Sequence, residues 1–320
     1  MRKRDGMAGE AIVLRLGTRG SPLALAQAHE ARARLAAAQG WPEERLAVVV
    51  IATTGDAIQD RSLSEAGGKG LFTKELDIAL LAGDIDVAVH SAKDLPTALP
   101  EGIALAGFLP REDVGDALIS RDGAGLAALP RRAVVGSASL RRQAQLRRLR
   151  PDLDVRLLRG NVQTRLRRVE AGDYHATVLA MAGLKRLGLT DRVTERLALD
   201  AFLPAVGQGA IAIAARAGDR ATAEALRPIL DLDTGAAVTC ERAFLGVLDG
   251  SCRTPIAGYA RVAGGRIQFR GELLSPDGAR SADSAAEGAA DEAERIGRTA
   301  GEDLLARAPA DLLAAVRGAP

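Results

Sequence analysis

Short β-like runs alternate with amphipathic helical segments along the chain, and this alternation constrains the fold more than any other feature. Residues 13–17 predict a strand. The helix that follows is expected to begin at Ser21-Pro22 and to end at Gly40, because serine caps helices, proline suits the first helical position and glycine suits the end. Residues 46–52 are an apolar β-branched run, typical of a strand buried on both faces. Such alternation predicts an α/β fold.

The pattern restarts twice, which predicts three α/β units without a sequence repeat. In the first unit a glycine-rich stretch at 53–70 is expected to be a long loop, followed by a helix at 71–82 and a strand at 85–89. The second unit is expected to hold strands at 116–120, 133–136, 155–158 and 176–180, with helices at 140–149 and 162–171 capped by Ser139 and Asn161. The third is expected to hold a helix through Gly246, strands at 256–262 and 266–273, a turn at 275–278 and a helix at 291–306.

Composition excludes several classes of protein. A chain of 320 residues with 47% hydrophobic and 26% charged residues is typical of a soluble globular protein with two or three domains. The longest uncharged run, 201–215, is too short and too interrupted to span a bilayer. No signal-peptide pattern follows the basic N-terminus, and residues 1–10 are expected to be a loose tail. The cysteines form no CxxC pair and the three histidines are scattered, so we predict no metal site and a reducing cytoplasm.

An arginine block lies between residues 131 and 168. It holds twelve arginines, no lysine and only two acids, Asp152 and Asp154, whereas the whole chain has a net charge of +2. The planar guanidinium holds carboxylates or phosphates by two points, so the block predicts a polyanionic ligand. A solvated basic helix face is the alternative. Nucleic acid is disfavoured as the ligand, because one Trp, two Tyr and five Phe offer little surface for base stacking.

Three expected strand-to-helix turns carry arginine together with hydroxyl or amide side chains. They are Thr18-Arg19-Gly-Ser21-Pro22, Gly136-Ser137-Ala-Ser139-Leu-Arg141-Arg142 and Arg159-Gly-Asn-Val-Gln-Thr-Arg165. Backbone N–H groups at a helix start bind anions, and an arginine one turn further on can reach the same anion. The set predicts a ligand with several separate anionic groups.

Two further segments hold groups that could do chemistry. Asp94 follows Lys93 at the end of a strand, where it could act as a general base, as a counter-ion to a developing cation, or only as a turn residue. His90 is expected to pack and not to catalyse. Cys252 lies in an accessible loop beside Arg253 and could be a nucleophile or an attachment point, whereas Cys240 is expected to be a buried small hydrophobe.

Several motifs together resemble the porphobilinogen deaminase (hydroxymethylbilane synthase) family, in order from about residue 12 to the C-terminus. They include the three turns above, the Cys252 loop, Gly67-Gly-Lys-Gly-Leu-Phe72, Ala88-Val-His-Ser-Ala-Lys-Asp94, Leu184-Lys-Arg-Leu-Gly188 and Leu203-Pro-Ala-Val-Gly-Gln-Gly209. The resemblance implies a transferase of tetrapyrrole and heme biosynthesis. Such an enzyme joins four porphobilinogen molecules head to tail, loses ammonia at each step and hydrolyses off the linear tetrapyrrole hydroxymethylbilane.

The resemblance also implies roles for individual residues. Cys252 would carry a dipyrromethane cofactor through a thioether, and Asp94 would contact pyrrole nitrogens and stabilise the cationic azafulvene formed as ammonia leaves. Carboxylates of the cofactor would be bound by Lys93, Ser137, Ser139, Arg141 and Arg142. Carboxylates of the substrate would be bound by Arg19, Ser21, Arg159, Arg165 and Arg186, with Lys69 on a loop near the active site. The remaining arginines of two helices are expected to be solvated surface: Arg147, Arg148, Arg150, Arg167 and Arg168.

For the fold, the resemblance implies two periplasmic-binding-protein-like α/β domains around a cleft and a smaller C-terminal α/β domain with an antiparallel sheet. The expected boundaries are 1–109 plus about 205–228, then 110–204, then 229–320. A cytoplasmic monomer without nucleic-acid or membrane partners is expected. Three positions depart from the family pattern, Gly20, Glu65 and Ala138. The alternative function is a non-catalytic two-lobed anion-binding module, which would need no thiol.

Overall fold

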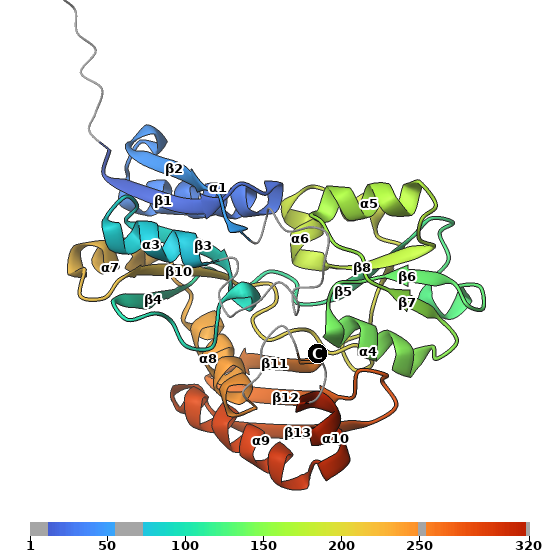
Figure 1. Cartoon of the computed structure of the whole chain (residues 1–320). Helices are drawn as coiled ribbons and strands as arrows, with labels where there is room; N and C mark the ends of the chain where they lie inside the picture. Colours follow the sequence, from blue (N-terminus) through green and yellow to red (C-terminus); the bar gives the residue numbers. More distant parts are fainter. Residues whose placement is uncertain (1–11, 55–72, 249–253, 318–320) are drawn as a thin grey trace, which may run out of the picture.

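The computed structural model describes residues 12–54, 73–248 and 254–317, and it builds them around three β-sheets (Figure 1). The first sheet has the order β2-β1-β3-β10-β4 and, with its helices, is called the first lobe. Its strands are β1 (Leu14–Arg19), β2 (Leu46–Ile51), β3 (Val87–Ser91), β4 (Ile103–Phe108) and β10 (Ile211–Arg216). Its helices are α1 (Pro22–Gln39), α3 (Lys74–Ala82) and α7 (Arg220–Leu226).

The second sheet has the order β7-β6-β8-β5-β9 and belongs to the second lobe. Its strands are β5 (Asp116–Ser120), β6 (Val134–Gly136), β7 (Asp154–Arg156), β8 (Ala176–Ala180) and β9 (Glu195–Arg196), with helices α4 (Leu140–Leu149), α5 (Val162–Glu170) and α6 (Met181–Arg186). The third unit is an antiparallel sheet of β11 (Ile256–Ala263), β12 (Arg266–Leu274) and β13 (Ser281–Ala289), covered by α8 (Leu232–Val247), α9 (Ala293–Arg307) and α10 (Ala310–Arg317).

The chain enters the second lobe after β4 and returns to the first lobe for β10 and α7. β10 follows the second sheet in the chain but pairs antiparallel between β3 and β4, and β5 follows β4 but pairs antiparallel between β8 and β9. The two connections, residues 109–115 and 197–210, are called the crossovers. They run side by side, because the Glu112 amide donates to the Gly209 carbonyl at 3.2 Å. The two crossovers therefore join the lobes next to each other, and the predicted domain boundaries near them stay a prediction.

Local signals placed most elements correctly. Ser21 caps α1 by accepting from the Ala24 amide, and Gly40 ends that helix with a φ of 65°. Ser139 and Asn161 cap α4 and α5 as expected. The expectation that residues 46–52 form a strand buried on both faces is wrong, because β2 is an edge strand and Val50 is 55% exposed. β13 was not predicted, since its alanines, serines and acids have low strand propensity.

The third unit docks on the second lobe through arginines that were expected to be solvated. Arg147 donates to the Pro276 carbonyl at 2.7 Å, and Arg148 pairs with Glu272 of β12. Arg150 stays within the second lobe, where it donates to the Leu129 carbonyl at 3.0 Å and pairs with Asp152. For these three the expectation is wrong, whereas Arg167 and Arg168 are exposed.

Helices α8 and α9 pack at close range in the third unit. A Cβ built on Gly297 of α9 would lie 1.9 Å from the carbonyl oxygen of Cys240, so only glycine permits this approach. Cys240 itself is fully buried in the same core, which confirms the expectation, and burial raises the pKa of its thiol to about 12. No described helix of any unit is both long and apolar enough to cross a membrane.

Replacing Gly297 with alanine should lower the free energy of unfolding by about 1–3 kcal/mol, because the added methyl forces the two helices apart. Gly235→Ala in α8 is the matched control, since nothing lies within 4 Å of its added Cβ. That control should leave stability unchanged or raise it by up to about 1 kcal/mol. Urea titration measures both. Equal stability of the two variants would contradict the packing argument.

Candidate active site

Asp94 lies just after β3, in a short 3-10 helix of one turn, Ala92–Asp94. Arg19, the last residue of the parallel strand β1, places its Nη1 3.7 Å from the Asp94 Oδ2. Both side chains line one pocket. Its polar lining is Arg19, Ser21, Gln27, His90, Ser91 and Asp94. His90 is buried, as expected, and burial together with the Arg19 charge lowers its pKa to about 4, so the imidazole is neutral at physiological pH.

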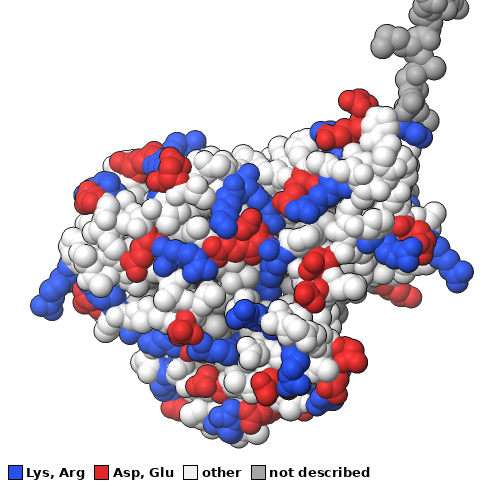
Figure 2. All heavy atoms as spheres, turned by 180° about the vertical axis from the view of Figure 1, so that it is seen from behind, with Lys and Arg blue, Asp and Glu red and all other residues white. Residues whose placement is uncertain are grey.

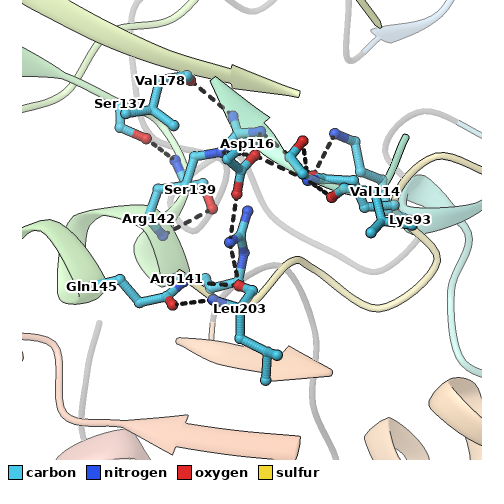
Figure 3. A network of polar contacts seen from close by, with 12 residues as sticks. Lys93, Val114, Asp116, Ser137, Ser139, Arg141, Arg142, Gln145, Val178 and Leu203 are labelled. Carbon is cyan, nitrogen blue, oxygen red and sulfur yellow. Dashed lines mark hydrogen bonds and ion pairs between the residues drawn. The ribbon is translucent and has the colours of Figure 1, made fainter. Parts of the chain in front are cut away.

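Arg141 and Arg142 lie in the first turn of α4 and share one buried acid, Asp116 at the start of β5 (Figure 3). The Nη1 of Arg141 lies 2.8 Å from Oδ2 of Asp116, and the Nη2 of Arg142 lies 2.6 Å from Oδ1. Burial alone would raise the pKa of Asp116, but the charges and hydrogen bonds of the two arginines more than offset this and lower it. The carboxylate is therefore ionised inside the protein.

The two arginines differ in the donors that they have left. Arg142 gives its Nε and Nη2 to Asp116 and its Nη1 to the Val178 carbonyl at 3.0 Å. Arg141 donates through Nη1 to the Leu203 carbonyl at 2.7 Å, while its Nε is buried without a hydrogen-bond partner. A buried unsatisfied donor costs free energy, so Arg141 is the better placed of the two to receive an additional anionic group.

Lys93 is connected to this cluster across the crossovers. Its Nζ lies 3.4 Å from Oε1 of Gln208, and the Nε2 of Gln208 donates to the Val114 carbonyl at 2.8 Å and to Asp116 at 3.0 Å (Figure 3). Burial, and after it the Arg142 charge, lower the pKa of Lys93 to about 8. Gln208 is fully buried and was not among the expected site residues. Its only sequence signal was the motif Leu203–Gly209.

The turn before α5 adds further positive charge. Asn161 caps α5, and the Nε of Arg165 donates to the Gly160 carbonyl at 2.9 Å. Burial, and then the charges of Arg142 and Arg159, lower the pKa of Arg165 to about 10, while Asp94 acts in the opposite direction. Arg165 thus lies within electrostatic range of groups from both lobes. A desolvated group of like charges is stabilised by an anionic ligand.

The serines of the second turn serve the backbone. Ser137 is fully buried and accepts from the Ser139 amide at 3.2 Å, and Ser139 accepts from the Arg142 amide at 3.4 Å. Arg186, at the end of α6, pairs with Glu30 of α1. Two expected site residues, Lys69 and Cys252, lie outside the described residues, as does Glu65.

The site therefore combines many cations with few acids, and they come from both lobes. The cations are Arg19, Lys93, Arg141, Arg142, Arg159 and Arg165, and the acids are Asp94 and Asp116. Elsewhere, on the face that Figure 2 shows, basic and acidic side chains alternate. The concentrated positive charge at the lobe boundary is typical of a two-lobed α/β protein with a site for an anionic ligand.

Comparison with known proteins identifies the family. Residues 14–224 match the model "Porphobilinogen deaminase, dipyromethane cofactor binding domain", and residues 236–306 match "Porphobilinogen deaminase, C-terminal domain". The chain is 57% identical to the porphobilinogen deaminase of Nitrobacter hamburgensis and 56% identical to that of Nitrobacter winogradskyi, over 93% of this chain and 94% of each relative. The chain belongs to the porphobilinogen deaminase family.

Solved structures that match part of the chain include periplasmic binding proteins. The aliphatic sulphonate binding protein SsuA of Escherichia coli has a TM-score of 0.41 at 16% identity, over 73% of this chain and 69% of that one. An arginine-specific binding protein of Salmonella typhimurium has a TM-score of 0.40 at 13% identity, over 70% and 94%. The family assignment rests on the sequence relatives alone. The expected α/β fold, with a smaller C-terminal antiparallel unit, is confirmed by the three sheets.

The pKa of Lys93 gives a pH prediction. In the protein without a bound carboxylate, Lys93 should lose its proton as the pH rises through about 8 while the arginines keep theirs, so the affinity for a carboxylate ligand should fall with an apparent pKa near 8. Lys93→Arg keeps the charge and should move this fall in affinity to higher pH. Unfolded lysine stays protonated up to about 10.5, so the free energy of unfolding should rise between these two pH values. A fall in affinity at the same pH in Lys93→Arg would refute the assignment.

Proposed function

We propose that this chain is a hydroxymethylbilane synthase that joins four porphobilinogen molecules with loss of ammonia and then releases the linear tetrapyrrole by hydrolysis. One observation supports this most: a cluster of buried and partly buried cations from both lobes lies around Asp94 and the pocket beside it. Porphobilinogen carries two carboxylates for each pyrrole, so a growing chain of pyrroles presents the spaced anions that separate turns can bind. The family assignment supports the same activity.

The described residues suit a dipyrromethane cofactor, which the first family domain binds. Its carboxylates would be held by Lys93 and Arg141, with Arg142 and the turn of Ser137 and Ser139 behind them. The unpartnered Nε of Arg141 and the low pKa of Lys93 both mark places where an added carboxylate would be stabilising. When bound, this cofactor supplies the pyrrole carbon to which the first substrate molecule is joined, and Cys252 would hold it as a thioether.

Asp94 would act on the substrate. Its carboxylate is 31% exposed and lines the pocket, so a pyrrole N–H can donate to it directly. As ammonia leaves the substrate, positive charge develops on the pyrrole, and a nearby carboxylate stabilises that charge. Arg19 and Ser21 line the same pocket and would bind the substrate carboxylates, which orients the ring over Asp94. Arg159 and Arg165 of the second lobe would bind further carboxylates of the substrate, and Lys69 and Arg186 would make additional contacts.

The proposal also covers the oligomeric state, the cellular compartment and the partner of the protein. A monomer in the cytoplasm is expected, with porphobilinogen as the small-molecule partner. Light scattering coupled to size-exclusion chromatography tests the oligomeric state. Incubation of the purified protein with porphobilinogen tests the activity itself, by the release of ammonia and the appearance of a linear tetrapyrrole.

The attachment residue can be tested by mass. Intact-protein mass spectrometry should show the added mass of two pyrrole units, and Cys252→Ala should remove it. Cys240→Ala is the matched control and should keep it, because the Cys240 thiol is buried and its pKa of about 12 leaves almost no thiolate to react. A wild-type protein that is unmodified and fully active would contradict the proposal of a covalently bound primer.

The role of Asp94 can be tested by removing its carboxylate. Asp94→Ala should fold normally, since the side chain is partly exposed, and should reduce kcat by about 10²–10⁴-fold. Asp84→Ala is the control, because Asp84 is an exposed acid just before the opposite end of β3. Circular dichroism checks the fold and an ammonia assay the rate. Wild-type turnover in Asp94→Ala would refute the role given to Asp94.

A further inference from the structure

Arg186 is held in the structure by an acid of the opposite lobe. Its Nε donates to Oε2 of Glu30 at 3.0 Å, and its Nη2 donates to the carbonyl of Gly209 at 3.2 Å. Glu30 lies on α1 of the first lobe, Arg186 ends α6 of the second, and Gly209 lies in a crossover. The two helices pack together at the lobe boundary (Figure 1). This ion pair therefore spans the two lobes next to the segment that joins them.

Glu30 has a second cation within reach on its own helix. The Nε of Arg34, one turn further along α1, donates to Oε1 of Glu30 at 3.2 Å. The two arginines thus use different oxygens of one carboxylate. If Arg186 turned away, Glu30 would keep Arg34 as a partner and would not be left as an uncompensated charge.

Breaking the Glu30–Arg186 pair would cost little free energy for Glu30. For Arg186 it would be unfavourable unless another carboxylate took the place of Glu30. The Glu30 side chain is 26% exposed and can be hydrated, whereas the Arg186 side chain is 8% exposed. A buried guanidinium needs a counter-charge, and a hydrated carboxylate does not. Arg186 should therefore leave Glu30 only for another carboxylate.

We propose that Glu30 is a positioning residue that occupies Arg186 as a substitute carboxylate until a carboxylate of the ligand displaces it. The inference rests on the proposed function, in which Arg186 binds a carboxylate of the substrate or of the growing chain. Glu30 keeps the guanidinium in place at the lobe boundary and competes with the ligand for it. Arg34 sets the strength of that competition, because it partly neutralises Glu30.

Two variants on the same helix should then change binding in opposite directions. Glu30→Gln removes the competing charge and should lower KM for porphobilinogen about two- to five-fold, with a smaller change in kcat. Arg34→Gln leaves Glu30 with Arg186 as its only described partner in an ion pair, strengthens that pair and should raise KM about twofold. If the Glu30–Arg186 pair were only a structural contact between the lobes, the two variants would not shift KM in opposite directions. Both would then only lower the melting temperature.

The experiment uses the holoprotein, with cofactor loading checked by intact mass in every variant. KM and kcat are measured with porphobilinogen. Calorimetry then measures the affinity for an unreactive analogue in which a methyl group replaces the aminomethyl group, so that binding is read without turnover. The analogue should bind Glu30→Gln more tightly than wild type, and Arg34→Gln more weakly.

A third variant separates this inference from the function on which it rests. Arg186→Gln should raise KM about tenfold or more, because a charge-assisted contact is lost. If it leaves KM unchanged, Arg186 binds no ligand carboxylate, and both that role and the positioning role of Glu30 are refuted. If Arg186→Gln raises KM while the other two variants shift it in the same direction or not at all, only the positioning role is overturned. Absence of any turnover of porphobilinogen refutes the proposed function.

Discussion

The ion cluster of Asp116 with Arg141 and Arg142 is the interaction on which the site depends. All three side chains are almost fully buried, and removing one partner of such a cluster typically costs about 3–5 kcal/mol, because the remaining charge is left without compensation. Asp116 is also the first residue of β5, directly after the crossover 109–115. The cluster therefore fixes the start of α4 to the sheet at the point where the chain enters the second lobe, and it places Arg141 beside the lobe boundary.

Gln208 extends this cluster into the first lobe. Its amide contacts Lys93 on one side and Asp116 on the other, and it also reaches the Val114 carbonyl of the opposite crossover. A neutral amide can do this because it donates and accepts at once, so it links a cation to an anion without adding charge. The same few hydrogen bonds therefore connect Lys93 to both crossovers, and the Arg186–Glu30 ion pair adds a separate contact between the lobes.

The sequence predicted what depends on local chemistry. Strand and helix positions followed from apolar periodicity and caps such as Ser139, and the arginines next to helix starts pointed to the turns that bring positive charge to the lobe boundary. Contacts between distant segments could not be predicted in this way. Asp116 was seen only as part of a strand, Arg147 and Arg148 only as surface, and Gln208 only as part of a motif. Their roles depend on which crossover or unit lies opposite, and side-chain periodicity carries no information on that.

The arginine block is explained by three different uses of one side chain. Arg147, Arg148 and Arg150 bind carbonyls and acids and so attach the third unit and a loop to α4. Arg142 commits its donors to Asp116 and the Val178 carbonyl, while Arg141 keeps one buried donor without a partner. Arg165 belongs to a desolvated set of like charges. Of these arginines, only Arg141 and Arg165 are arranged so that a bound carboxylate lowers their free energy. Charge density in a sequence therefore indicates a ligand less directly than the number of guanidinium donors that the folded protein leaves unsatisfied.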